Sequence, residues 1–132
     1  MKLFSKKLNA DSYTGLIPLG THIAGNINWV GVLKVQGSCN GQFATSSNED
    51  ENCIILDTGG MLTFDEITSS NAIIGGVVNA RQLRVTHTLR VLSTASISGA
   101  VIYYRHLEIE PGAKIHDCQL RHLDQEDTAQ QV

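Results

Sequence analysis

The side chains best suited to bind a metal or to act in catalysis are five histidines and three cysteines: His22, His87, His106, His116, His122, Cys39, Cys53 and Cys118. A zinc site needs converging ligands, with one position left open for catalysis. His116 and His122 are six residues apart and could reach one corner of a repeating fold. Most of the histidines, however, alternate with apolar residues and are expected to point outward. We therefore predict no catalytic residue, no metal site and no cofactor.

The remaining chemical motifs are equally sparse. The cysteines are odd in number and form no Cys-x-x-Cys pair, which argues against a disulfide framework or a zinc ribbon and predicts reduced, mostly buried thiols. The acidic run 49–51 lacks the spacing and glycine of an EF-hand, so 45–52 is predicted to be an exposed loop. No GxSxG, HExxH, P-loop or GxGxxG motif occurs, and the pairs Gly59-Gly60 and Gly75-Gly76 are interpreted as corners rather than phosphate cradles.

The composition indicates one domain built from strands. The 132 residues are rich in Val, Ile, Thr and Gly, which favour strands and turns. A net charge of −3 and 5% aromatic residues argue against a nucleic-acid-binding surface. No segment approaches the roughly 18 apolar residues of a membrane span, and the start of the chain lacks a secretory signal, so we predict a cytoplasmic protein.

Apolar residues recur every six positions through the middle of the chain. Positions 83, 89, 95, 101, 107 and 113 are Leu, Leu, Ala, Val, Leu and Ala, and positions 85, 91, 97, 103, 109 and 115 are Val, Val, Ile, Tyr, Ile and Ile. Residues two apart on a strand share a face. The two series therefore predict short strands separated by corners, with Tyr103 in the core. Segments 73–85 and 97–109 also align at an offset of 24, and 89–101 and 107–120 at an offset of 18.

Three faces of six residues make one eighteen-residue coil of a triangular β-solenoid. Residues 16–123 are predicted to form about six coils, after a flexible N-terminal tail (1–15) and before a disordered C-terminal tail (124–132). An apolar-x-Gly-x-apolar pattern at 23–27, 39–43 and 97–101 puts a glycine at a corner, where φ is positive or a Cβ would clash. The alternative is a β-sandwich, whose strands rarely keep one fixed period.

The segments LRVLSTASISGAVIYYRHLEIEPGAKIHDCQL (89–120) and GTHIAGNINWVGVLKVQGSCNGQF (20–43) resemble the core of the bactofilins. These are bacterial cytoskeletal proteins with a right-handed β-helix domain. The acid-rich turn of a late family coil is matched here by residues 108–113, and the resemblance covers about 100 residues. Two stretches depart from the family pattern. Residues 44–72 carry the acidic loop and weak repeats, and 83–94 looks like an extra six-residue face, so irregular stacking is expected in the middle.

The resemblance implies a non-enzymatic polymer that assembles end-to-end without nucleotide, often at the cytoplasmic face of the inner membrane. Its implied role is a scaffold for cell shape or for positioning envelope proteins. Its implied partners are further copies of the chain, membrane lipid and envelope or cell-wall proteins, with no nucleic acid. Open coil ends with unpaired backbone groups favour such stacking on physical grounds as well.

The resemblance also implies a polymerisation interface in the last coil. In the family, an apolar residue after the Gly-Ala turn lies in this contact, and the matching residue here is Ile115. Three further apolar residues are expected near it: Leu107, Ile109 and Leu120. That these four residues are ordinary core remains an alternative.

The start of the chain predicts a membrane contact. It combines basic and apolar residues: Lys2, Leu3, Phe4, Lys6, Lys7 and Leu8. Each basic side chain gains about 1 kcal/mol near an anionic leaflet, and the apolar side chains can enter the interface. Family members often carry such an N-terminus, and a filament would multiply a weak contact. The alternative is a solvated tail.

Two other functions remain open. A six-residue period also marks the left-handed β-helix of hexapeptide acyltransferases and gamma-class carbonic anhydrases, and EPGAKI (110–115) resembles such a hexad. Such an enzyme would need a trimer and a metal or acyl-CoA. A β-helix adaptor that binds a partner through one face would instead be a stable monomer.

Overall fold

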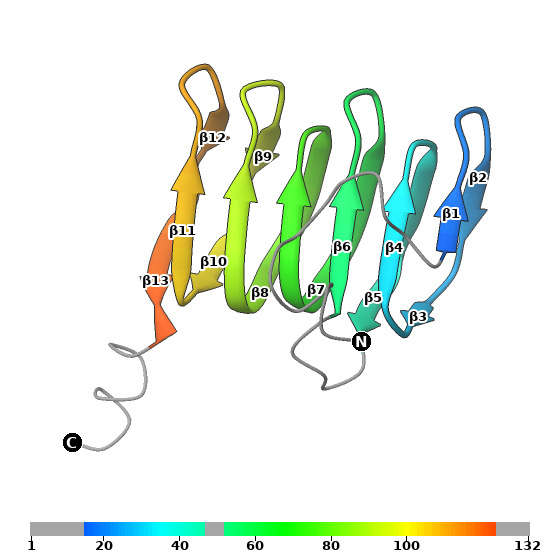
Figure 1. The fold of residues 1–132 in the computed structure, drawn as a ribbon, viewed down its shortest axis with the longest axis horizontal. Coiled ribbons are helices and arrows are strands. Elements are labelled where there is room, and N and C mark those ends of the chain that lie inside the picture. Colours follow the sequence, from blue (N-terminus) through cyan, green and yellow to red (C-terminus); the bar gives the residue numbers. More distant parts are fainter. Residues whose placement is uncertain (1–14, 47–51, 124–132) are drawn as a thin grey trace.

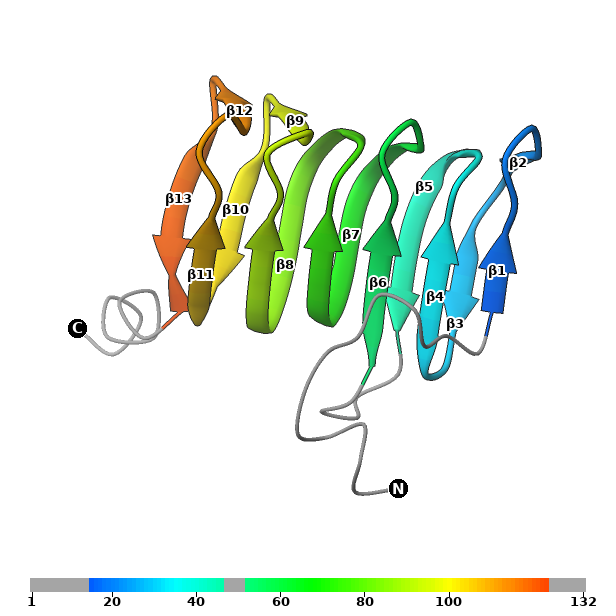
Figure 2. The ribbon, with the colours of Figure 1, turned by 45° about the horizontal axis from the view of Figure 1, so that its top comes forward.

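The computed structural model describes residues 15–46 and 52–123, which form a 13-stranded β-solenoid. The chain rises along one face, crosses over and descends, and its coils advance in a right-handed sense from β1 to β13 (Figures 1 and 2). This confirms the predicted fold class. The acidic run 49–51, the candidate membrane residues 2–8 and the tail 124–132 lie outside the described residues.

The strands are short, or long where they continue around a corner. Their bounds are β1 (Gly15–Ile17), β2 (His22–Ala24), β3 (Ile27–Trp29), β4 (Val32–Val35), β5 (Ser38–Ser46), β6 (Cys53–Leu56), β7 (Met61–Ile74), β8 (Val77–Val91), β9 (Ser96–Ser98), β10 (Val101–Tyr104), β11 (His106–Ile109), β12 (Lys114–His116) and β13 (Gln119–His122).

The strands stack in parallel on three faces. The first face is built by β1, β4, β6, the end of β7, the end of β8 and β11, which counts six coils. The second face begins with β2 and ends with β12, and the third begins with β3 and ends with β13. The long strands β5, β7 and β8 contribute to more than one face, because they run through a corner without a break.

The register agrees with the eighteen-residue step near the C-terminal end. There Leu89 pairs with Leu107, and Ile97 pairs with Ile115. The offset of 24 does not describe stacking, because Leu83 pairs with Ile102 and not with Leu107. That offset equals one coil plus one face, so it aligned strands that lie on different sides of the solenoid.

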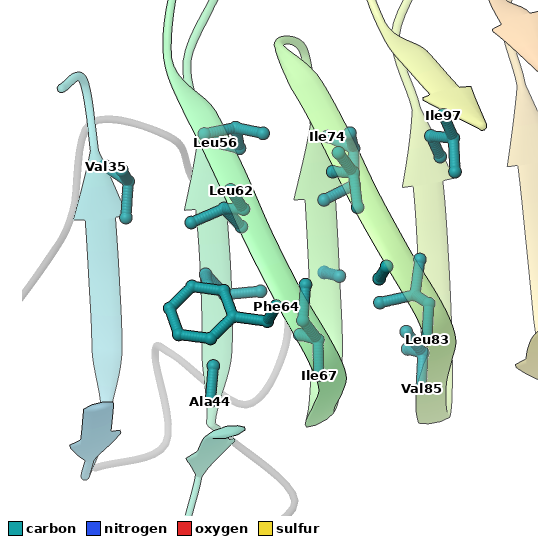
Figure 3. Close-up of a cluster of buried hydrophobic side chains, with 14 of the residues drawn as sticks. Val35, Ala44, Leu56, Leu62, Phe64, Ile67, Ile74, Leu83, Val85 and Ile97 are labelled. Atoms are coloured by element: carbon teal, nitrogen blue, oxygen red, sulfur yellow. The ribbon is translucent and has the colours of Figure 1, made fainter. Parts of the chain in front are cut away.

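The core contains four ladders of inward-pointing side chains, with one residue from each coil after the first (Figure 3). Most of their inner members are fully buried, and each fully buried Leu or Ile contributes about 1.5–3 kcal/mol. The ladders are Leu33–Ile54–Ala72–Leu89–Leu107, Val35–Leu56–Ile74–Val91–Ile109, Cys39–Leu62–Val78–Ile97–Ile115 and Ala44–Ile67–Leu83–Ile102–Leu120.

The prediction that Tyr103 lies in the core is wrong, because the six-residue series shifts by one position in β10. Ile102 is fully buried and stacks on Leu83, whereas the Tyr103 ring lies 5.1 Å from the guanidinium of Arg84 on the outer side. The cause is the spacing around the preceding corner, where the inward residues Ile97 and Ile102 lie five positions apart, whereas the series steps by six.

The irregular stacking expected in the middle takes the form of one bulge, because the pairing of β7 with β8 shifts its register between Ser69 and Asn71. Residues 83–85 and 89–91 occupy ordinary neighbouring faces of β8, so 83–94 contains no extra face. The sequence between β5 and β6 is longer than at other corners, but pairing resumes at once when Ile54 stacks on Ala72. The longer connection therefore leaves the core in register.

Two buried asparagines hold the corner beside this longer connection. The Asn52 side-chain oxygen accepts a hydrogen bond from the Gly31 backbone at 2.8 Å. The Asn71 amide donates to the Asn52 carbonyl at 3.1 Å, and its oxygen accepts from the Thr88 backbone at 3.3 Å. Such bonds satisfy polar groups that would be costly to bury without a partner.

The glycines of the apolar-x-Gly-x-apolar pattern lie where the sequence predicts, at the corner between the second and third faces. Gly25 and Gly99 have φ of +132° and +75°. A Cβ added to Gly41 would collide with the Gly25 carbonyl oxygen. Both reasons for a corner glycine are thus confirmed.

Candidate polymerisation interface

The four residues of the implied interface lie together at the C-terminal end of the solenoid. Each is the last member of one core ladder and stacks on a fully buried residue of the coil before it. Ile109 and Leu120 are each 44% exposed, and Leu107 and Ile115 are half-buried. These four side chains are more exposed than the residues on which they stack, because the described residues contain no further coil beyond them.

Three residues that the sequence analysis did not assign to this end also pack there. Tyr104 and Cys118 are half-buried against the core, and Leu123 is buried. The Tyr104 ring meets the His122 ring edge-on, with 5.4 Å between centroids. All four residues of β10 are apolar or aromatic, so alternation could not show that Tyr104 points inward.

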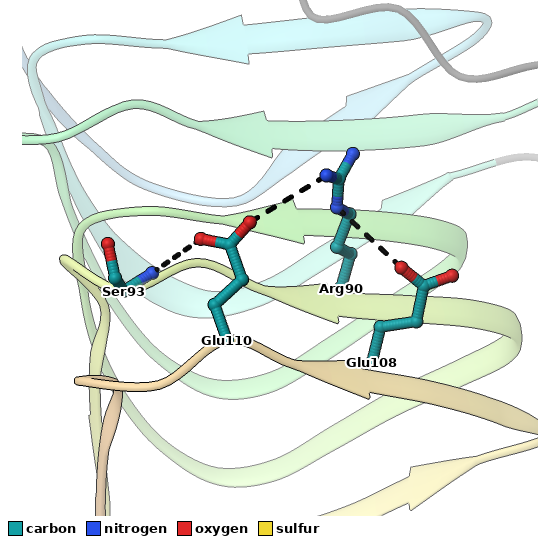
Figure 4. A network of polar contacts seen from close by, with 4 residues as sticks. All are labelled: Arg90, Ser93, Glu108 and Glu110. Carbon is teal, nitrogen blue, oxygen red and sulfur yellow. Dashed lines mark hydrogen bonds and ion pairs between the residues drawn. The ribbon is translucent and has the colours of Figure 1, made fainter.

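Charged side chains fasten the rim of the last coil to its neighbour (Figure 4). Arg90 lies between two carboxylates, 3.8 Å from Glu108 and 3.7 Å from Glu110. Glu110 also accepts a hydrogen bond from the Ser93 backbone at 3.0 Å. These groups are partly exposed, so each ion pair adds at most about 1 kcal/mol. The acid-rich turn thus fixes the position of β11 without covering its apolar residues.

The N-terminal end also presents an apolar cross-section. Ile17, Ile23 and Ile27 extend the core ladders by one coil, and the last two are half-buried. Within the part of the chain that the structure describes, β1, β2 and β3 have strand partners on one side only, as do β11, β12 and β13. Among the described strands, both ends therefore carry an edge with no further strand paired to it, beside apolar side chains, which is the arrangement that strand addition needs.

Comparison with known proteins gives this geometry a family context. The sequence model of the bactofilins, described as polymer-forming cytoskeletal, matches residues 15–118. The chain belongs to the bactofilin family. The match extends from β1 to the corner between β12 and β13, so it includes nearly the whole described solenoid. No match was found among curated proteins or among solved structures.

The histidines of this bactofilin are spread over the solenoid. His22 makes a 2.7 Å hydrogen bond to Ser38, and His122 contacts Tyr104. His116 and His122 lie on different faces, in β12 and β13. Among residues 15–46 and 52–123, no three His, Cys, Asp or Glu side chains are grouped as metal ligands.

The cysteines are unpaired, and two of them are buried. Burial raises the pKa of the Cys53 thiol to about 12 and also raises the pKa of Cys39. Because the thiolate is the reactive form, both side chains behave as small apolar residues. In the described ranges, no helix has the length and apolar character needed to cross a membrane.

Proposed function

We propose that this bactofilin is a non-enzymatic scaffold that assembles end-to-end into filaments without nucleotide. The observation that carries the proposal is the C-terminal coil, where four core ladders end in exposed or half-buried Leu and Ile. A second molecule stacked on this coil would continue both the ladders and the backbone pairing. Membership of a polymer-forming family supports the same arrangement.

Negative-stain electron microscopy of the purified protein tests this proposal, in the absence of nucleotide and metal and across a range of salt. We expect long thin filaments that persist at high salt, because apolar burial is not screened by ions. Discrete particles of trimer size would contradict the scaffold and favour the β-helix enzyme. Monomers at every condition would favour an adaptor.

We further propose that the filaments lie on the cytoplasmic membrane, where they support cell shape or position envelope proteins. The support is the sequence of the N-terminal segment, in which Leu3, Phe4 and Leu8 accompany Lys2, Lys6 and Lys7. Three basic residues contribute about 3 kcal/mol near an anionic surface. One copy binds weakly, but a filament carries many copies and gains avidity.

Deletion of residues 2–8 should abolish binding to anionic vesicles. Co-sedimentation with phosphatidylglycerol-containing liposomes measures this binding. We expect the affinity for these vesicles to fall by about a hundredfold, so that little protein is bound at limiting lipid. Neutral phosphatidylcholine liposomes serve as the control, and electron microscopy verifies that the deletion variant still polymerises. Unchanged binding to anionic vesicles would contradict the membrane role of this segment.

A further inference from the structure

The outer side of the first face carries apolar residues where a solvated surface is expected. Ile54 and Leu56 of β6 point into the core, so Cys53 and Ile55 point outward. Ile55 stacks on Ile73, and both belong to an apolar cluster separate from the core. We call this cluster the outer stripe; its members are Val32, Cys53, Ile55, Ile73 and Leu92.

The centre of the outer stripe is as buried as the core itself. Cys53, Ile55 and Ile73 are 1%, 2% and 3% exposed, whereas Leu16, on the outer side of the same face, is 41% exposed. Among the described residues, the apolar side chains that flank these three are Val32 and Leu92, both only partly buried. An apolar stripe on the outer side of a sheet is stabilised when a further layer of chain covers it.

The sequence indicates which segment can supply that layer. Outside the described ranges lie residues 1–14, 47–51 and 124–132. Residues 47–51 read SNEDE and contain no apolar side chain, and 124–132 read DQEDTAQQV, following the last coil. Only 1–14 combine several large apolar residues, among them Leu3, Phe4 and Leu8.

The point of entry agrees with this assignment. β1 lies on the first face, next to β4, which in turn pairs with β6. Two to three strand spacings of about 4.8 Å separate Gly15 from the outer stripe, roughly 10–14 Å. Fourteen extended residues reach up to about 46 Å. The segment that precedes Gly15 can therefore place Leu3, Phe4 and Leu8 on the outer stripe of its own molecule.

We propose that the outer stripe is the docking surface of the chain's own N-terminal segment, which is seated there through Leu3, Phe4 and Leu8. The same apolar side chains are the candidate membrane contacts, so a docked segment is withheld from lipid. This consequence, unlike the docking itself, rests on the proposed membrane function. Docking would then keep an unassembled molecule off the membrane until many copies compete for the lipid together.

Thiol labelling of the full-length protein tests the docking without lipid, so its failure is distinct from failure of membrane binding. N-ethylmaleimide modification of each cysteine is followed by peptide mass spectrometry. The test variant is L3D/F4D, and the matched control is K6Q/K7Q, which keeps the apolar residues. Cys39 reports on the core, and the half-buried Cys118 reports on the far end.

We expect L3D/F4D to raise the labelling rate of Cys53 by about tenfold or more, because exposure returns its pKa toward the ordinary thiol value. Cys39, Cys118 and the K6Q/K7Q variant should keep the wild-type rates. The rates should also be the same at two protein concentrations about tenfold apart, since docking within one molecule is independent of concentration. An unchanged Cys53 rate in L3D/F4D would overturn the proposal. A Cys53 labelling rate that depends on protein concentration would also overturn it. So would a Cys53 labelling rate that rises only in a variant that lacks residues 47–51.

A reciprocal variant covers the case in which Cys39 also becomes reactive in L3D/F4D. I73D alters the outer stripe and leaves the neighbouring core residues Ala72 and Ile74 in place. We expect I73D to raise the rate of tryptic cleavage after Lys6 and Lys7 by about tenfold, because a docked segment resists the protease. Equal cleavage rates in I73D and the wild type would overturn the docking.

Discussion

Replacement of Ile115 with arginine should give a folded, soluble monomer and raise the critical concentration for assembly by about a thousandfold. Loss of apolar burial at the contact costs about 2 kcal/mol, and a guanidinium enclosed between two apolar ends costs about 2 kcal/mol more. Together these terms correspond to roughly three orders of magnitude in affinity. Sedimentation of the polymer across a concentration series measures the change.

The monomer should tolerate this substitution because Ile115 is only half-buried and belongs to the last coil. An arginine there can lay its methylenes over Ile97 and extend its charged head beyond the end of the solenoid. His116→Arg is the matched control. It adds one positive charge at the neighbouring position of β12, on the exposed outer side, and should polymerise normally.

Each alternative makes a different forecast for this pair of variants. A molten or aggregated Ile115→Arg protein beside a folded His116→Arg protein would identify Ile115 as ordinary core. A folded Ile115→Arg protein that still assembles at the wild-type concentration would exclude the C-terminal coil from the contact. Circular dichroism and gel filtration distinguish these outcomes before the polymer is measured.

Much of the solenoid could be predicted because residues close together in the sequence specify its strands and corners. Residues two apart share a strand face, and a fixed step between such pairs specifies the coil, so Leu89, Val91 and Ile97 were assigned to the core from sequence alone. The resemblance to the bactofilins, rather than the period, then placed Ile115 in the interface and grouped Leu107, Ile109 and Leu120 with it.

The outward position of Tyr103 and the outer stripe could not be predicted, because both depend on how successive coils pack against one another. The shift that moves Tyr103 to the outside arises because the inward residues Ile97 and Ile102 lie five positions apart, and one position of drift cannot be seen in an average period of six. The outer stripe was missed for a related reason. Cys53 to Leu56 form an unbroken apolar run, and such a run gives no sign that its outward residues are covered as well as its inward ones.

Replacement of Gly76 with alanine should lower the free energy of unfolding by about 2–4 kcal/mol, or the melting temperature by roughly 10 °C. An added Cβ would lie 2.7 Å from the Asp57 carbonyl oxygen and closer still to that of Gly60. Neither oxygen can retreat freely. Asp57 accepts a 2.9 Å hydrogen bond from the Gly60 backbone, and Gly60 accepts a 3.0 Å bond from Val77. Relief of the clash must therefore separate two coils.

Gly59→Ala provides the matched control in the corner that Gly76 packs against. Gly59 has φ of +91°, but no atom lies within 4 Å of its added Cβ, so its substitution meets backbone strain without a collision. That strain costs about 1 kcal/mol. Thermal unfolding of both variants at one protein concentration separates the two effects. Equal losses of stability would show that the corner yields to a methyl group. A larger loss for Gly76→Ala would show that contact between backbones, rather than turn conformation, sets the spacing of the coils.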